Sequence, residues 1–194
     1  MGSSEVKLGN PAVVGLAGFS MTTFVLQCHN LELCGIAPVL WLGIFFGGGA
    51  QLIAGLFEFK KNNNFGFCAF TSYGAFWISL CCLIIFGHSP ELVKSYPVFA
   101  FDAKDLGYFL TGWTILTFGL FIASMKHNTT LALVFLTLLL GFIGLVVKEF
   151  TGSSAAGLFA AYDLILCAFL AFYLMLASIF GEAGIKLPVG GPWF

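Results

Sequence analysis

The sequence has 194 residues, of which 59% are hydrophobic and only 9% are charged, and its mean hydropathy is +0.99. This composition excludes an ordinary soluble domain and predicts an integral membrane protein. A net charge of −1 and the absence of arginine exclude a basic nucleic-acid-binding surface and a guanidinium site for anions.

Six apolar runs are each long enough to cross a bilayer core, which needs roughly 20 residues of helix. Apolar and polar residues do not alternate along these runs, so the runs favour helices over the strands of a barrel. The predicted spans are residues 12–27, 34–57, 67–86, 107–125, 131–147 and 155–180. With no long soluble insertion between them, we expect one membrane domain over residues 1–194.

The first predicted span carries a polar stripe. Phe19, Thr23 and Gln27 recur every four residues, so they share one face of the helix. Hydroxyl and amide groups on an otherwise oily helix indicate a face that meets a polar cavity. Asn10-Pro11, just before this span, is typical of a helix start, where Asn10 either only caps the helix or marks free N–H groups that attract an anion.

The second span presents small residues at helical spacing. Gly43, Gly47 and Gly55 share one face with Gln51, a pattern that lets two helices approach closely in lipid. Gln51 either bonds a neighbouring helix or faces a polar cavity. Glu58, three residues beyond this face, is either an interfacial carboxylate balanced by the lysines that follow it or a group that carries a proton.

The third and sixth spans add further polar candidates. Thr71 and Tyr73 lie in the third span, and Asp163 lies well inside the sixth. An ionisable residue at that depth usually marks a functional site, although it can also pair with another helix or lie closer to the interface. Glu58 and Asp163 are therefore the candidates for proton coupling.

The sequence lacks the residue sets that enzymes and metal sites use. It has no metalloprotease, serine-hydrolase or phosphate-loop motif, and its three histidines fall in loops or at span ends. The six cysteines have no metal-type spacing. We therefore expect no catalytic residue, no metal ion and no cofactor.

A short internal repeat relates the two halves of the chain. Residues 18–26, GFSMTTFVL, match residues 112–120, GWTILTFGL, and the spacing of Glu58 in the first half resembles that of Glu149 in the second. Because each half has three spans, the second half must enter the membrane from the opposite side. The sequence thus predicts an all-α protein with a 3+3 inverted repeat, an arrangement common in transporters.

The lysines predict how the chain is oriented in the membrane. Five of them, including Lys7, fall on the side of the two ends of the chain, against three on the other side. Because positively charged loops stay in the cytoplasm, we expect residues 1–10 and 182–194 to be cytoplasmic. The short segment before the first span favours the plasma membrane of a prokaryote.

Several stretches resemble the acetate uptake transporter family. They are GNPAVVGLAGFSMTTF, His29-Asn30, FFGGGAQLIAGLFEFKKNNNFG and AFTSYGAFW. The first motif of the family is usually NPAPLGL, and this chain keeps five of its seven positions as NPAVVGL. The resemblance covers nearly the whole chain and implies six-helix subunits in homo-hexamers, each subunit with its own pore for acetate and related short carboxylates such as succinate.

The resemblance also implies a constriction in that pore. Matched onto this chain, the constriction falls at Phe19, Tyr73 and Leu138, although helix packing would equally account for these three residues without the resemblance. The substrate-binding candidates together are Asn10, Phe19, Thr23, Gln51, Thr71, Tyr73 and Leu138. We expect the carboxylate to be passed among hydroxyl groups, including that of Tyr73, amide groups and free helix-start N–H groups.

Three functions remain open at this point. The first is uptake of acetate and related carboxylates coupled to protons, and the second is a passive small-anion channel with the same lining. The third is a structural membrane protein without a substrate, in which the polar stripes only hold helices together. Only the proton-coupled transporter requires a titrating group on the path.

Overall fold

The computed structural model describes residues 9–194, which contain six segments long and apolar enough to cross a membrane. They are α1 (Ala12–Asn30), the continuous α2 (Ala37–Ile44), η1 (Phe45–Ala50) and α3 (Gln51–Lys60), α4 (Asn64–Gly87), α6 (Ala103–Ser124), α7 (Thr129–Thr151) and α8 (Ser154–Glu182). The prediction of six helical spans is confirmed, with boundaries shifted by a few residues. Residues 1–8 of the expected cytoplasmic segment lie outside the described residues.

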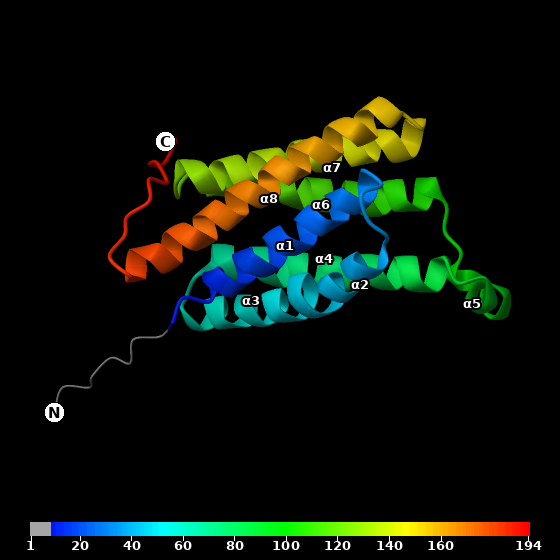
Figure 1. Ribbon diagram of the computed structural model, residues 1–194, viewed down its shortest axis with the longest axis horizontal. Coiled ribbons are helices and arrows are strands. Elements are labelled where there is room, and N and C mark those ends of the chain that lie inside the picture. The colour runs from blue at the N-terminus through cyan, green and yellow to red at the C-terminus, as the bar shows by residue number, and fades with distance from the viewer. Residues whose placement is uncertain (1–8) are drawn as a thin grey trace.

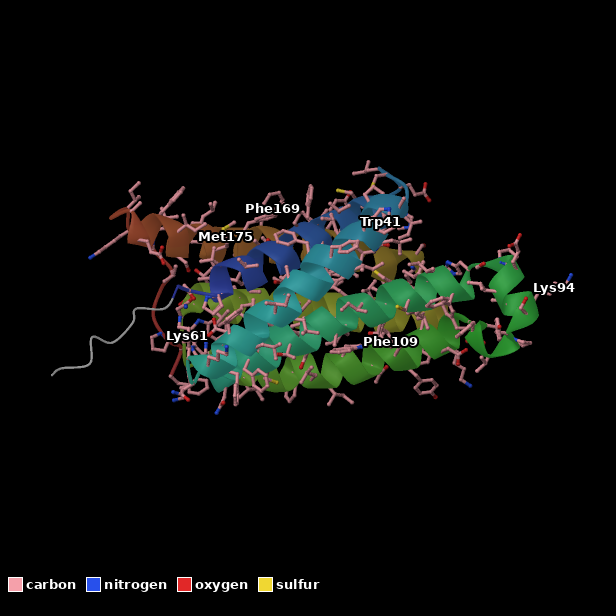
Figure 2. The ribbon with its side chains drawn as sticks, turned by 90° about the horizontal axis from the view of Figure 1, so that it is seen from below. Trp41, Lys61, Lys94, Phe109, Phe169 and Met175 are labelled. Carbon is pink, nitrogen blue, oxygen red and sulfur yellow. The ribbon has the colours of Figure 1, made fainter. Side chains whose placement is uncertain are left out.

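The spans form one elongated bundle in which α1, α4 and α7 run in the same direction (Figure 1). The start of α1 and the end of α8 lie at one end, called here the terminal end. The short α5 (Pro90–Ser95) and the 3-10 helix η2 (Pro97–Phe99) form the opposite end, called here the α5 end. Figure 2 shows Lys61 at the terminal end and Lys94 at the α5 end, while Lys7 lies outside the described residues.

The glycine face predicted in the second span packs inside the chain. The middle of this span is the π-helix η1, where Gly47 lies directly against Thr22 of α1. Gly43 and Gly55 lie equally close to α4 on either side of that turn. Small residues at this spacing therefore join helices within the chain.

The C-terminal tail, residues 183–194, folds back over the turn between α6 and α7. The carbonyl oxygen of Val189 accepts hydrogen bonds from the Thr130 backbone N–H at 3.0 Å and from its hydroxyl at 3.1 Å. The Trp193 N–H donates to the carbonyl of Met125 at 2.8 Å. The tail thus holds the α6–α7 turn in place at the terminal end.

The two glycines that match in the predicted repeat have different surroundings. A Cβ added to Gly18 would lie 2.6 Å from the backbone carbonyl oxygen of Phe46, whereas one added to Gly112 would meet nothing within 4 Å. Gly18 therefore allows α1 to approach η1, and Gly112 serves no such contact. The inverted repeat itself stays a prediction.

The substitution Gly18→Ala tests this close approach. We expect it to lower the free energy of unfolding by about 1–3 kcal/mol, the usual cost of forcing a methyl group into a filled core, because the Phe46 carbonyl belongs to the backbone and cannot rotate away. Gly112→Ala is the matched control and should leave stability unchanged or slightly higher. Thermal unfolding in detergent measures both variants, and equal midpoints would contradict the close packing.

Candidate functional site

Two cavities lie at opposite ends of the bundle. The first cavity, at the terminal end, has a volume of about 210 Å³ and is lined by the first turns of α1, α4 and α7. Its polar lining consists of Gln51, Asn63, His127, Asn128 and Ser178. Within the described residues, no aspartate, glutamate or lysine lines this cavity, so its surface offers hydrogen bonds without a fixed charge.

Three helices begin at the first cavity with uncharged caps. The Asn63 side chain accepts a hydrogen bond from the Gly66 N–H at 3.1 Å, and Asn128 accepts one from Leu131 at 2.9 Å. At α1, the Asn10 Oδ1 atom accepts a hydrogen bond of 3.3 Å from the Ala12 N–H. Ala12 lines the cavity, but Asn10 does not. No acidic residue occupies the first turn of any of these three described helices. The positive ends of α1 and α7 therefore favour an anion in the cavity, whereas the start of α4 already has the Glu58 carboxyl group of α3 beside it.

The second cavity, at the α5 end, has a volume of about 610 Å³. The last turns of α1, α4 and α7 line it, together with the start of α6. In contrast to the first cavity, its lining includes charged and titratable groups, among them Lys148, Glu149 and Asp102. The same three helices thus begin at one cavity and end at the other.

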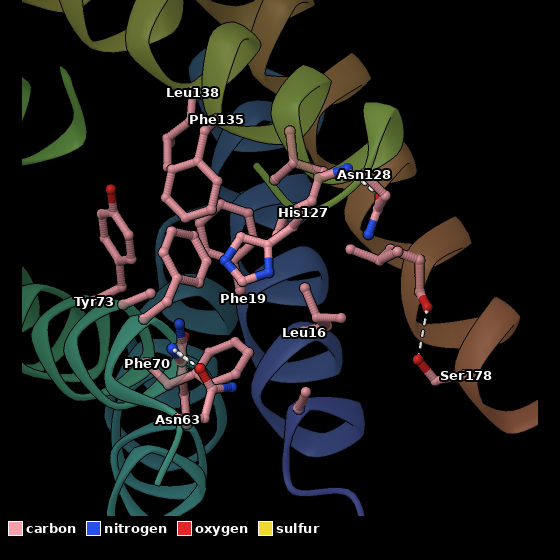
Figure 3. Close-up of a pocket in the computed structure, with 18 residues that line it drawn as sticks. Leu16, Phe19, Asn63, Phe70, Tyr73, His127, Asn128, Phe135, Leu138 and Ser178 are labelled. Atoms are coloured by element: carbon pink, nitrogen blue, oxygen red, sulfur yellow. Dashed lines mark hydrogen bonds between the residues drawn. The ribbon is translucent and has the colours of Figure 1, made fainter. Parts of the chain in front are cut away.

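A layer of apolar side chains closes the first cavity on the side that faces the middle of the bundle. Phe19 of α1, Tyr73 of α4 and Leu138 of α7 are all buried, line the first cavity and do not line the second (Figure 3). The ring centroids of Phe19 and Tyr73 are 5.9 Å apart, and those of Tyr73 and Phe135 are 6.3 Å apart. The three residues that the family resemblance selected are thus brought together.

The far side of this layer is also aromatic. Phe76, about one turn beyond Tyr73 on α4, lines the second cavity together with Leu110. Its ring lies edge-on to Trp113 with centroids 5.2 Å apart and to Phe142 with centroids 5.5 Å apart. The separation between the two cavities is about one turn along α4, from Tyr73 to Phe76, and about two turns along α7, from Leu138 to Leu145.

The Tyr73 hydroxyl is directed to a neighbouring helix. Its oxygen lies 2.8 Å from the Thr117 Oγ1 atom of α6. Because the Thr117 hydroxyl donates to the Trp113 carbonyl at 2.7 Å, the Tyr73 hydroxyl is the donor in this pair. The bond fixes the ring, so Tyr73 presents an aromatic surface to the cavity while its hydroxyl is already occupied.

Gln51 and Glu58 lie two turns apart on α3, and both are about 1% exposed. Gln51 lines the first cavity, and its Oε1 atom has no hydrogen-bond partner among residues 9–194. Glu58 does not line the cavity, but its Oε2 atom accepts a hydrogen bond of 2.7 Å from the Asn63 side chain, which does. Asn63 therefore connects the buried carboxyl group to the cavity.

Three other predicted residues line neither cavity. The Thr71 hydroxyl donates to the Phe67 carbonyl of its own helix at 2.5 Å, and the residue packs against α3. Thr23 is buried, with its Oγ1 atom unpartnered within the described residues. Asp163 lies half-buried on α8, away from both cavities, and its Oδ2 atom likewise finds no partner in residues 9–194.

Several lining residues did not emerge from the sequence. Phe135 lies on the same face of α7 as Leu138, so its spacing was a usable signal. Asn63, His127 and Asn128 fell in segments expected to be loops. Asparagine two or three residues before an apolar run is a cap signal that would have placed Asn63 and Asn128 at helix starts.

The sequence matches the model of the GPR1/FUN34/yaaH family over residues 2–188. It is 39% identical over 192 residues to the succinate-acetate/proton symporter SatP of Escherichia coli (strain K12), covering 96% of this chain and 97% of that protein. It is 33% identical over 189 residues to acetate permease A of Emericella nidulans, covering 89% of this chain and 62% of that longer protein.

The fold also matches a solved structure. The structure of the bacterial acetate channel SatP superimposes with a TM-score of 0.87 at 37% sequence identity, covering 95% of this chain and all of that one. The expectation that the chain is a membrane transport protein and not an enzyme agrees with these matches. The chain therefore belongs to the GPR1/FUN34/yaaH family, a family of membrane transporters.

Proposed function

We propose that this protein carries acetate and related short-chain carboxylates, with succinate as a further substrate, across the membrane between its two cavities. The observation that carries the proposal is the first cavity, where the starts of α1, α4 and α7, none with an acidic residue in its own first turn, converge above the layer of Phe19, Tyr73 and Leu138. Helix starts of this kind favour a carboxylate without the strong grip of an arginine. The related symporter and permease are named for the same substrates.

The chemistry of acetate suits the two kinds of surface on this path. Its carboxylate can exchange water for N–H groups at the helix starts and for the side-chain amide of Gln51. Its methyl group can pass the apolar rings, where a larger or more polar solute would lose more hydration. Weak binding followed by a short apolar barrier is what rapid conduction requires.

The assembly and the orientation follow as part of the same proposal. We place the protein in the plasma membrane with the terminal end in the cytoplasm, supported by the lysine distribution in the sequence. Homo-hexamers with one pore in each subunit rest on the family resemblance. With this orientation, the first cavity opens toward the cytoplasm and the second toward the outside.

The substitution Phe19→Ala tests the apolar layer as a size filter. We expect the ratio of lactate to acetate flux to rise at least about threefold, since one methylene group in an apolar pocket is worth roughly 1–3 kcal/mol. Radiolabelled uptake into proteoliposomes measures both solutes after subtraction of uptake by protein-free liposomes. Phe118→Ala, at an exposed ring on α6, is the matched control and should keep the wild-type ratio.

An unchanged ratio in both Phe19→Ala and Leu138→Ala would remove the layer from the selection of substrates. If wild-type protein transported neither solute above the protein-free background, the structural alternative without a substrate would stand instead.

Proton coupling is proposed for Glu58. Its carboxyl group is buried, one oxygen is bonded to Asn63, and the other has no partner among residues 9–194, where a proton can be held. Asn63 gives this group a hydrogen-bonded link to the first cavity. Asp163 remains the second candidate, but it lacks such a link.

The substitution Glu58→Gln tests this assignment. Glutamine keeps an oxygen that can accept the Asn63 bond but cannot release a proton, so acetate flux should persist while its stimulation by an inward proton gradient is lost. Initial rates with and without the gradient measure the effect, and Asp163→Asn should retain the stimulation. If a gradient fails to stimulate the wild-type protein, the passive-channel alternative holds; if Asp163→Asn alone loses the stimulation, Asp163 takes the role.

A further inference from the structure

The last turns of α1, α4 and α7 each bring a basic side chain to the second cavity. His29 lies in the last turn of α1, His88 is the residue after α4, and Lys148 lies in the last turn of α7. All three line this cavity. A helix end carries a partial negative charge, so three converging ends repel an anion unless these bases are charged.

Acidic side chains add to that negative charge. Glu149 forms an ion pair with Lys148, with Nζ and Oε1 3.3 Å apart, and Asp102 lines the opposite wall at the start of α6. When both histidines are neutral, the lining therefore carries one positive and two negative side chains; when both are protonated, it carries three positive and two negative. Charged groups on the adjoining segments that do not line the cavity are Glu32, Glu91, Lys94, Lys104 and Asp105.

Each of the two histidines has a ring nitrogen that is free to bind a second proton without movement of the ring. The Nδ1 atom of His29 lies 3.0 Å from the carbonyl oxygen of Cys34, and because a carbonyl only accepts, this nitrogen carries a hydrogen and Nε2 is left to be protonated. His88 stacks on Phe101 with ring centroids 5.2 Å apart, which leaves its edge nitrogens unobstructed by that ring.

We propose that His29, His88 and Lys148 form a docking site for carboxylate anions in the second cavity. Protonation of the two histidines strengthens the binding of anions to this site. The proposal rests on the proposed function, because it takes the docked anion to be one on its way through the bundle. Histidine is the side chain whose charge ordinarily changes between about pH 5 and pH 8. The second cavity thus binds acetate more strongly when the solution around it is acidic.

The double substitution His29→Gln with His88→Gln tests the site. Exchange of radiolabelled acetate across proteoliposomes is measured at about pH 5.5 and about pH 7.5, with the same pH on both sides so that no gradient contributes and the orientation of the protein does not matter. After subtraction of protein-free liposomes, the wild-type flux should be at least about threefold higher at the acidic pH, within the range that local electrostatic fields produce. The double variant should show a clearly smaller ratio than the wild type, because only the contribution of the proposed proton carrier Glu58 remains.

Lys94→Gln is the control, because Lys94 is a positive charge at the same end of the bundle that does not line the cavity, and its loss should leave the ratio of the two fluxes at the wild-type value. Lys148→Met should lower flux at both pH values, since it removes the charge that is present at each of them.

Four outcomes are decisive. A wild-type flux that does not depend on pH overturns the docking site while leaving transport intact. A pH ratio that is unchanged in the double variant, or that is lost in Lys94→Gln instead, also overturns it. Absence of any acetate flux above the protein-free background overturns the proposed function and the docking site together.

Discussion

An anion that crosses this bundle must give up water at the layer formed by Phe19, Tyr73 and Leu138, and the rest of the structure depends on that constraint. A carboxylate has no charged partner there, so the layer has to be thin and the approaches to it have to be polar. The hydrogen bond from Tyr73 to Thr117 helps to keep the layer thin, because it fixes the ring that closes the first cavity. Buried Phe19 and Leu138 complete the layer from two other helices.

The direction of the helices makes the two approaches different. Because α1, α4 and α7 run the same way, all three begin at the first cavity and end at the second. Uncharged asparagines cap α4 and α7, and α1 has no acidic residue in its first turn, whereas α6, which runs the opposite way, begins with the acidic pair Asp102 and Asp105. The protein therefore has a first cavity that favours anions through its backbone and a second one whose charge depends on side chains. Close contacts at Gly18 and Gly47 hold α1 in the position that this arrangement needs.

Much of the fold could be predicted from composition and periodicity, because long apolar runs in lipid have few alternatives to helices. The glycine face of the second span also predicted a close helix contact, but a single sequence cannot tell whether the partner belongs to the same subunit; here Gly47 meets Thr22 of α1. Polar residues in spans were harder to place. Thr71 bonds its own helix and packs against α3, a use of the hydroxyl that leaves no signature in the sequence.

The cavities could be predicted only in part. Phe19 and Gln51 stood out because they lie on polar or small-residue faces, and both line the first cavity. The histidines were assigned to solvated loops, since lone histidines at span ends usually are solvated. Their convergence on shared cavities depends on how helix ends from distant parts of the chain meet, and no local pattern encodes that.

Acetate exchange by wild-type protein and by Leu138→Trp measures the central claim most directly, namely that solute passes between the two cavities through the apolar layer. The larger indole ring should fill the space beside Phe19 and Tyr73, so the variant should retain its fold in detergent and lose acetate exchange down to the level of protein-free liposomes. A folded Leu138→Trp variant that exchanges acetate as fast as the wild type would contradict the account, because the solute would then be crossing the protein by another route.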